Sequence, residues 1–138
     1  MILFFNKKQN QKDENFIKIA ALLIHTAKID QDYSKNEEKI IKEALLKIGI
    51  SAENIEQTIT SAKELETNSN QILDFTKEVK KMENEDKKMI VETLWKIIYS
   101  NKEADIYETS LMRRLAGLLY IDSKVMGDIK EQIKKEIE

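Results

Sequence analysis

The sequence predicts an all-α protein that folds as a single domain of about seven helices. The 138 residues include no proline and only three glycines, whereas a sheet protein would need more residues suited to tight turns. Hydrophobic residues make up 41% of the chain and charged residues 35%, a composition typical of a soluble globular domain with its own core. Every predicted connection is short, so we expect no boundary inside residues 1–138.

Two of the predicted helices are apolar on nearly every side, and we therefore expect them at the centre of the bundle. They cover about residues 14–28 and 85–100. Leu23 of the first helix is expected to meet Leu94 and Trp95 of the second where the two helices cross.

An N-terminal extension, residues 1–12, precedes the first of these helices. Its apolar start, Met1–Phe5, is expected to pack back onto the core, with docking on a partner or a membrane surface as the alternative. It is too short for the apolar core of a signal peptide, and the apolar run Ile19–Ile24 is far too short to span a bilayer. We therefore expect a cytoplasmic protein without a transmembrane segment.

Five amphipathic helices complete the predicted bundle. Gly49 is placed to end one of them, and Ser51 to cap the next. The polar stretch 66–70 separates two halves, about residues 14–66 and 70–138. The apolar faces of the five helices include, in chain order, Ile41 and Leu45, Ile55 and Ile59, Ile72 and Phe75, Leu111 and Leu115, and Ile129 and Ile133.

An acidic segment follows each apolar helix, and the two segments, Asp30–Glu37 and Asn101–Glu108, align without a gap. In each, a short polar loop leads into an amphipathic helix. Apolar positions on both sides keep their class, as in the pairs Leu23/Leu94 and Ile50/Ile121. Two copies are too few for a solenoid, so the repeat predicts a pseudo-symmetric bundle in which the two apolar helices pair.

These segments hold the candidate metal ligands of the chain. Their hard oxygen donors would suit Ca²⁺ or Mg²⁺. Asp30 follows the end of a helix, where the helix dipole disfavours an anion, and so indicates a cation, a basic partner or simple exposure. Neither loop is an EF-hand, because the positions of its glycine and bidentate acid hold Lys35 and Ile41 in the first loop and Ile106 and Met112 in the second. The candidates are Asp30, Asp32, Ser34, Glu37, Asn101, Glu103, Asp105 and Glu108.

Helix capping is the alternative explanation of the same residues. Ser34 and Glu37 have the spacing of a capping box, and Asp105 and Glu108 form a close equivalent. In that interpretation the oxygens satisfy free N–H groups at the start of a helix and bind no ion.

Several function classes are disfavoured by the composition. The absence of cysteine excludes disulfides and thiolate zinc sites, and a single histidine, His25, makes a Ser-His-Asp triad improbable. His25 is interpreted as structural or exposed, and the Trp95–Tyr99 spacing as core packing. The net charge of -2 gives no reason to expect a nucleic-acid partner. Arg113 and Arg114 are interpreted as solvated or paired with acids.

The pattern in Ala27–Glu37, together with Leu94–Asn101 and Leu111–Ala116, resembles the tellurite-resistance protein TerB family over roughly residues 16–133. The same helical domain occurs at the N-terminus of some membrane-anchored J-domain co-chaperones. The resemblance implies an all-α domain whose acidic residues are proposed to bind divalent cations, in a stress or metal (tellurite) resistance context. This sequence has Gln31 and Lys102 where the family has glycine, and Asn101 where it has aspartate.

We therefore expect a non-enzymatic binding or interaction module with a protein partner that the sequence does not name. A metal-dependent hydrolase using the same carboxylates, and a purely structural adaptor, are the alternatives. The enzyme alternative is weakened because the sequence has no glycine-rich phosphate loop and no nucleophile–histidine pair.

Overall fold

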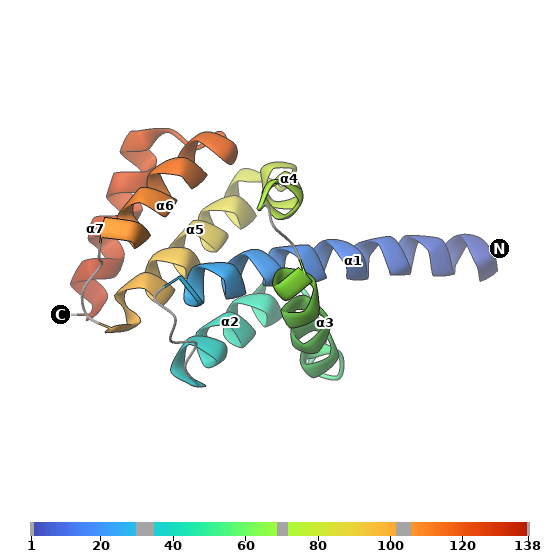
Figure 1. Cartoon of the computed structure of the whole chain (residues 1–138). Coiled ribbons are helices and arrows are strands. Elements are labelled where there is room, and N and C mark those ends of the chain that lie inside the picture. The colour runs from blue at the N-terminus through green and yellow to red at the C-terminus, as the bar shows by residue number, and fades with distance from the viewer. Residues whose placement is uncertain (1, 30–34, 69–71, 102–105, 138) are drawn as a thin grey trace.

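The computed structural model describes residues 2–29, 35–68, 72–101 and 106–137, and describes side chains from residue 14 onward except at 101, 106–108 and 137. Within these ranges the chain forms seven α-helices, one short 3-10 helix and no strand (Figure 1). The predicted all-α fold is confirmed. The elements are α1 (Ile2–Ala27), α2 (Lys35–Lys47), α3 (Ile55–Asn68), α4 (Leu73–Lys80), α5 (Asn84–Ile98), η1 (Tyr99–Asn101), α6 (Ile106–Leu118) and α7 (Ser123–Ile137).

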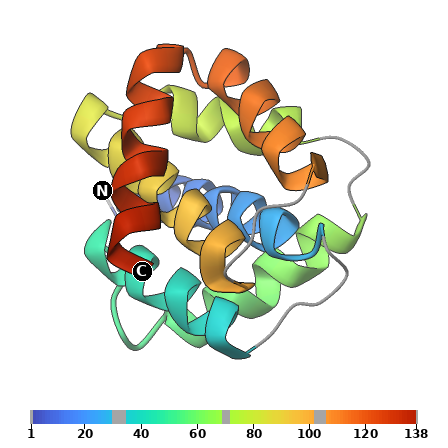
Figure 2. The same ribbon diagram turned by 90° about the vertical axis from the view of Figure 1, so that its left-hand side faces the viewer.

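Helices α1 and α5 form the centre of the bundle, as predicted. α1 packs against α2, α3, α4 and α5, and α5 also packs against α2 and α7 (Figure 2). Leu23 and Leu94 are fully buried, Trp95 is 3% exposed, and all three belong to one hydrophobic cluster. A helix that is apolar on most of its sides stabilises the fold only when neighbours cover those sides. This explains why both helices are surrounded.

The N-terminal residues do not fold back onto the core, so that expectation was wrong. They form the first part of α1, which starts at Ile2 and extends past the other helices (Figure 1). Residues 2–13 contain neither glycine nor proline, and several of them are good helix formers such as Lys and Gln, so nothing in the sequence interrupts the helix.

Helices α2 and α6 end in the same backbone arrangement, which supports the internal repeat. After α2, the Ile50 N–H donates to the Leu45 carbonyl (3.1 Å) and the Gly49 N–H to the Leu46 carbonyl (3.2 Å). After α6, the equivalent bonds run from Ile121 to Ala116 (3.0 Å) and from Tyr120 to Gly117 (3.3 Å). This is the Schellman pattern, which needs a residue with positive φ just after the helix.

Gly49 takes that position after α2 with a φ of 116°, so its predicted role as a helix terminator is confirmed. After α6 the position is held by Tyr120, with a φ of 55°. A side chain in this conformation costs about 1–2 kcal/mol. The Tyr120 ring is 74% exposed, and the Lys80 ammonium lies 4.0 Å from its centroid, a cation–π contact that offsets part of this cost.

The start of α3 differs from the prediction. The Ser51 carbonyl accepts from the Asn54 N–H (3.0 Å) in a separate turn, and α3 begins only at Ile55. Asn54 occupies the cap position, since its carbonyl accepts from the Thr58 N–H (2.9 Å). α3 then continues to Asn68, so the first residues of the polar stretch 66–70 are helical.

The central pair makes a direct prediction for stability. Leu94→Ala should lower the free energy of unfolding by about 2–5 kcal/mol, because it opens a cavity between helices that cannot readily close. The control is Leu46→Ala on α2, where the side chain is 43% exposed and should cost well under half as much. Urea unfolding followed by circular dichroism measures both, and a loss below about 1 kcal/mol for Leu94→Ala would contradict the central pairing.

The helix ends make a second prediction. Gly49→Ala should cost about 1–2 kcal/mol, since the positive φ is unfavourable for alanine even though the new methyl group meets no other atom. Gly127→Ala on α7 should instead raise stability by about 0.5–1 kcal/mol, because Gly127 has ordinary helical geometry and its Cβ would also be free of clashes. Equal effects of the two substitutions in thermal melts would show that φ does not decide the end of α2.

Candidate functional site

The two central helices end on the same side of the bundle, at the left in Figure 1 and facing the viewer in Figure 2. α1 ends at Ala27, and α5 passes through η1 to Asn101. The last carbonyl groups of a helix carry a partial negative charge. Two such ends on one side therefore create an environment that favours a cation.

Most of the predicted ligands lie outside the described residues. This applies to Asp30, Asp32, Ser34, Glu103 and Asp105. Asn101 ends η1 and Glu108 belongs to the first turn of α6, but their side chains are outside the described part. The proposed capping box of Ser34 lies outside it for the same reason, although α2 does begin at the next residue, Lys35. Glu37 is the one candidate whose side chain the structure describes.

Glu37 is buried in the first turn of α2, with 1% of its surface exposed. It is the only carboxylate among the buried residues of the described ranges; the other buried polar groups are threonines. Burial of a carboxylate is costly unless a positive charge, a hydrogen-bond donor or a metal compensates it. The positive end of the α2 dipole supplies part of that compensation. Among the residues with described side chains, no three acidic or histidine groups gather closely enough to hold a metal by themselves.

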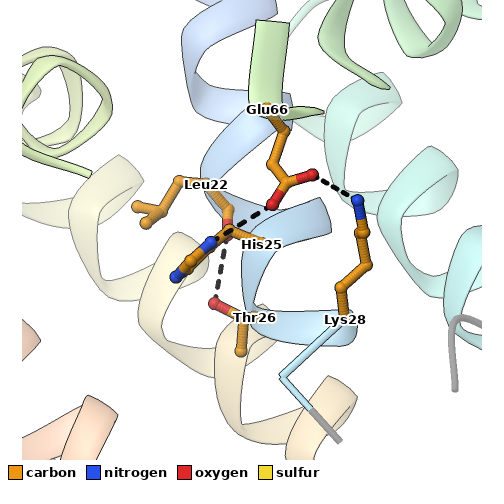
Figure 3. A network of polar contacts seen from close by, with 5 residues as sticks. All are labelled: Leu22, His25, Thr26, Lys28 and Glu66. Atoms are coloured by element: carbon orange, nitrogen blue, oxygen red, sulfur yellow. Dashed lines mark hydrogen bonds and ion pairs between the residues drawn. The ribbon is translucent and has the colours of Figure 1, made fainter. Parts of the chain in front are cut away.

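A second polar cluster, which the sequence did not reveal, joins α1 to the end of α3 (Figure 3). The Glu66 carboxylate lies 2.6 Å from the Lys28 ammonium and 3.3 Å from Nδ1 of His25. The Glu66 side chain is only 10% exposed, so water screens these contacts incompletely. In the same turn of α1 the Thr26 hydroxyl donates to the Leu22 carbonyl (3.0 Å). His25 thus has a structural role, and no local sequence signal links it to a residue so distant along the chain.

The α2–α3 surface carries a third set of charges. The Lys42 ammonium lies 2.6 Å from Glu56 and 3.9 Å from Glu38, and Lys63 lies 2.8 Å from Glu38. The hydrogen bond to Glu56 is the main cause that raises the pKa of Lys42. Desolvation opposes it, and the negative charges of Glu56 and Glu38 raise the pKa further. This network is exposed and therefore contributes little to stability.

Trp95 and Tyr99 stack on successive turns at the end of α5, with ring centroids 5.9 Å apart. Both are buried, so their interpretation as core packing is confirmed. Burial raises the pKa of the Tyr99 hydroxyl, and the negative charge of Glu131 on α7 raises it further. The indole Nε1 of Trp95 is also buried and has no hydrogen-bond partner within the described part of the chain.

Comparison with protein families gives a match to the model described as "Tellurite resistance protein TerB" over residues 16–131. This chain belongs to the TerB family. The match runs from the second half of α1 into α7 and includes both acidic segments. No curated protein and no solved structure matches the chain. Among the described helices of this TerB domain, none has the length and apolar character needed to cross a membrane.

The Glu66 cluster of this TerB domain gives a third prediction. Glu66→Gln should lower the free energy of unfolding by about 1–2 kcal/mol, since it removes the charge that holds Lys28 and His25. Glu64→Gln on the same helix is the matched control, because Glu64 is exposed and should leave stability within about 0.5 kcal/mol. Denaturant melts at low and high salt measure both variants. An equal loss for Glu64→Gln would mean that net charge, rather than the cluster, is responsible.

Proposed function

We propose that this TerB domain is a non-enzymatic binding module that holds a divalent cation, Ca²⁺ or Mg²⁺, at the acidic connections that follow α1 and α5. One observation carries the proposal. Glu37 presents a buried carboxylate at the start of α2, and only residues 30–34 separate α2 from the turn that ends α1. The family assignment supports a tellurite-resistance-related domain as its biological context.

The donor chemistry favours a hard cation. Asp30, Asp32 and Glu37 offer carboxylate oxygens and Ser34 a hydroxyl, which Ca²⁺ and Mg²⁺ prefer over softer ligands. The partial negative charge at the end of α1 acts in the same direction. In the second segment Asn101 replaces one carboxylate by an amide, so we expect weaker binding there through Glu103, Asp105 and Glu108.

The module is proposed as non-enzymatic because the residues that could activate a nucleophile are few. The chain has no cysteine. Its single histidine, His25, contacts Glu66 where α1 packs against α3. The carboxylates of the acidic connections are then best explained as ligands. Binding of the ion would link α1 to α2, and so stabilise a surface for a partner protein.

Thermal melts with added metal test the proposal. Millimolar Ca²⁺ or Mg²⁺ should stabilise the wild type, by up to about 2.7 kcal/mol at a hundredfold excess over the dissociation constant. Asp30→Asn and Glu37→Gln should each abolish this gain, while Asn101→Asp should strengthen the response of the second segment. Glu43→Gln is the matched control, because Glu43 is an exposed acid on α2 away from its first turn.

The capping alternative forecasts the opposite result. If the acidic residues only cap helices, added metal changes nothing, and Asp30→Asn leaves stability level or raises it by about 0.3–1 kcal/mol through relief at the helix end. Ser34→Ala costs about 1 kcal/mol under either model and so verifies that the assay detects the loss of a cap. A wild type indifferent to both ions would refute the cation proposal.

A further inference from the structure

A groove between α6 and α7 has Trp95 among its lining residues and has no role in the function proposed above. Its volume is about 480 Å³, within the range of small-molecule sites. Trp95 comes from the central helix α5, while the walls come from the two helices of the second half. The apolar lining consists mainly of Trp95, Met112, Ala116, Ile121 and Met126.

Two glycines line this groove. Gly117 of α6 and Gly127 of α7 both line it, and a Cβ atom built on either would meet no atom within 4 Å. Neither glycine has the positive φ that would require glycine for conformational reasons, in contrast to Gly49. Glycine inside a helix is unfavourable by about 0.5–1 kcal/mol relative to alanine, so packing and stability do not explain these two residues.

The charged residues that line the groove are both positive. Arg113 and Lys130 line it, and none of its described lining residues is acidic. The Lys130 ammonium lies 5.5 Å from the centroid of the Trp95 ring, and Arg113 is exposed on α6. The lining therefore presents two positive charges above an apolar floor.

The internal repeat allows the groove residues to be compared with their counterparts in the first half. In the ungapped alignment of the two halves, Arg113 corresponds to Lys42 and Gly127 to Glu56. In this register Ile55 and its counterpart Met126 are both buried, whereas the buried Ile59 corresponds to the partly exposed Lys130. In the first half the exposed Lys42–Glu56 ion pair, at 2.6 Å, joins α2 to α3. In the second half Arg113 keeps the positive charge of Lys42, while Gly127 replaces the acidic Glu56.

Trp95, one of the lining residues, also carries a donor without a partner. Its indole Nε1 is buried and has no hydrogen-bond partner among the described residues, although buried N–H groups are nearly always hydrogen-bonded.

We propose that this groove binds an organic acid with an apolar body. In the second half the ligand carboxylate plays the part that Glu56 plays in the first half. Its partners are Arg113 and Lys130, because guanidinium and carboxylate form strong charge-assisted hydrogen bonds. The apolar body packs against Trp95 and the methionines, whose unbranched side chains adapt to different shapes. This proposal does not depend on the cation at the acidic connections.

Titration with octanoate tests it directly, with 3-phenylpropionate as an aromatic acid of similar size. Trp95 is the only tryptophan of the chain, so a change in its fluorescence reports on this groove, and calorimetry provides a second readout. We expect saturable binding of at least one acid and at least about tenfold weaker binding of octanol, which lacks the charge. The better of the two acids shows whether an aliphatic or an aromatic body fits. Equal binding of octanol and octanoate, or no signal in either readout, would overturn the proposal.

Variants separate the charge from the shape of the groove. Arg113→Gln should weaken acid binding at least about tenfold, whereas Arg114→Gln, at the neighbouring exposed position that does not line the groove, should not. Gly127→Glu should abolish binding by restoring an internal carboxylate, and Gly127→Gln, of nearly equal size, should retain at least about tenfold more affinity than Gly127→Glu. Circular dichroism confirms that each variant is folded. Equal affinities for Gly127→Glu and Gly127→Gln, or for Arg113→Gln and Arg114→Gln, would show that the charge has no part in binding.

Discussion

The structure depends on the burial of α1 and α5 beneath the other helices. From Ile19 to Ala27 and from Ile90 to Ile98 nearly every apolar side chain of the two helices is buried, so each needs neighbours on several sides. The other helices are arranged around this pair, with α2 and α3 on one side of it and α6 and α7 on the other (Figure 1). The same pairing brings the C-terminal ends of both helices to one side of the molecule, and so determines where the acidic connections begin.

The two halves of the internal repeat share the backbone arrangement at two helix ends but differ in their surface residues. The hydrogen bonds after α2 and α6 correspond one to one, even though Gly49 in one half is Tyr120 in the other. The helix surfaces that follow differ. The Lys42–Glu56 pair joins α2 to α3, whereas a groove lined by Gly117 and Gly127 lies between α6 and α7. The two halves of the bundle therefore share a backbone arrangement at these helix ends and differ in the charges on their exposed faces.

The sequence predicted the features that depend on local pattern. Helical periodicity placed the seven helices, and the two apolar helices were correctly expected at the centre. Two local expectations were wrong for physical reasons. The N-terminus continues α1 because no residue there interrupts a helix, and α3 starts after Ser51 because a turn uses the Ser51 carbonyl first. The acidic segments were recognised from residue type and spacing alone, and of their eight candidate ligands only Glu37 has a described side chain.

By itself, the sequence determined the fold class, the central pair, the helix end at Gly49 and the residues that place the chain in the TerB family. These follow from periodicity, turn chemistry and motif, all of which act over a few neighbouring residues. Only the tertiary structure decided that Glu66 contacts Lys28 and His25, and that Trp95, two glycines and two basic residues line one groove. Such contacts join side chains from different helices, and their geometry depends on how the helices cross, which no single segment of the chain encodes.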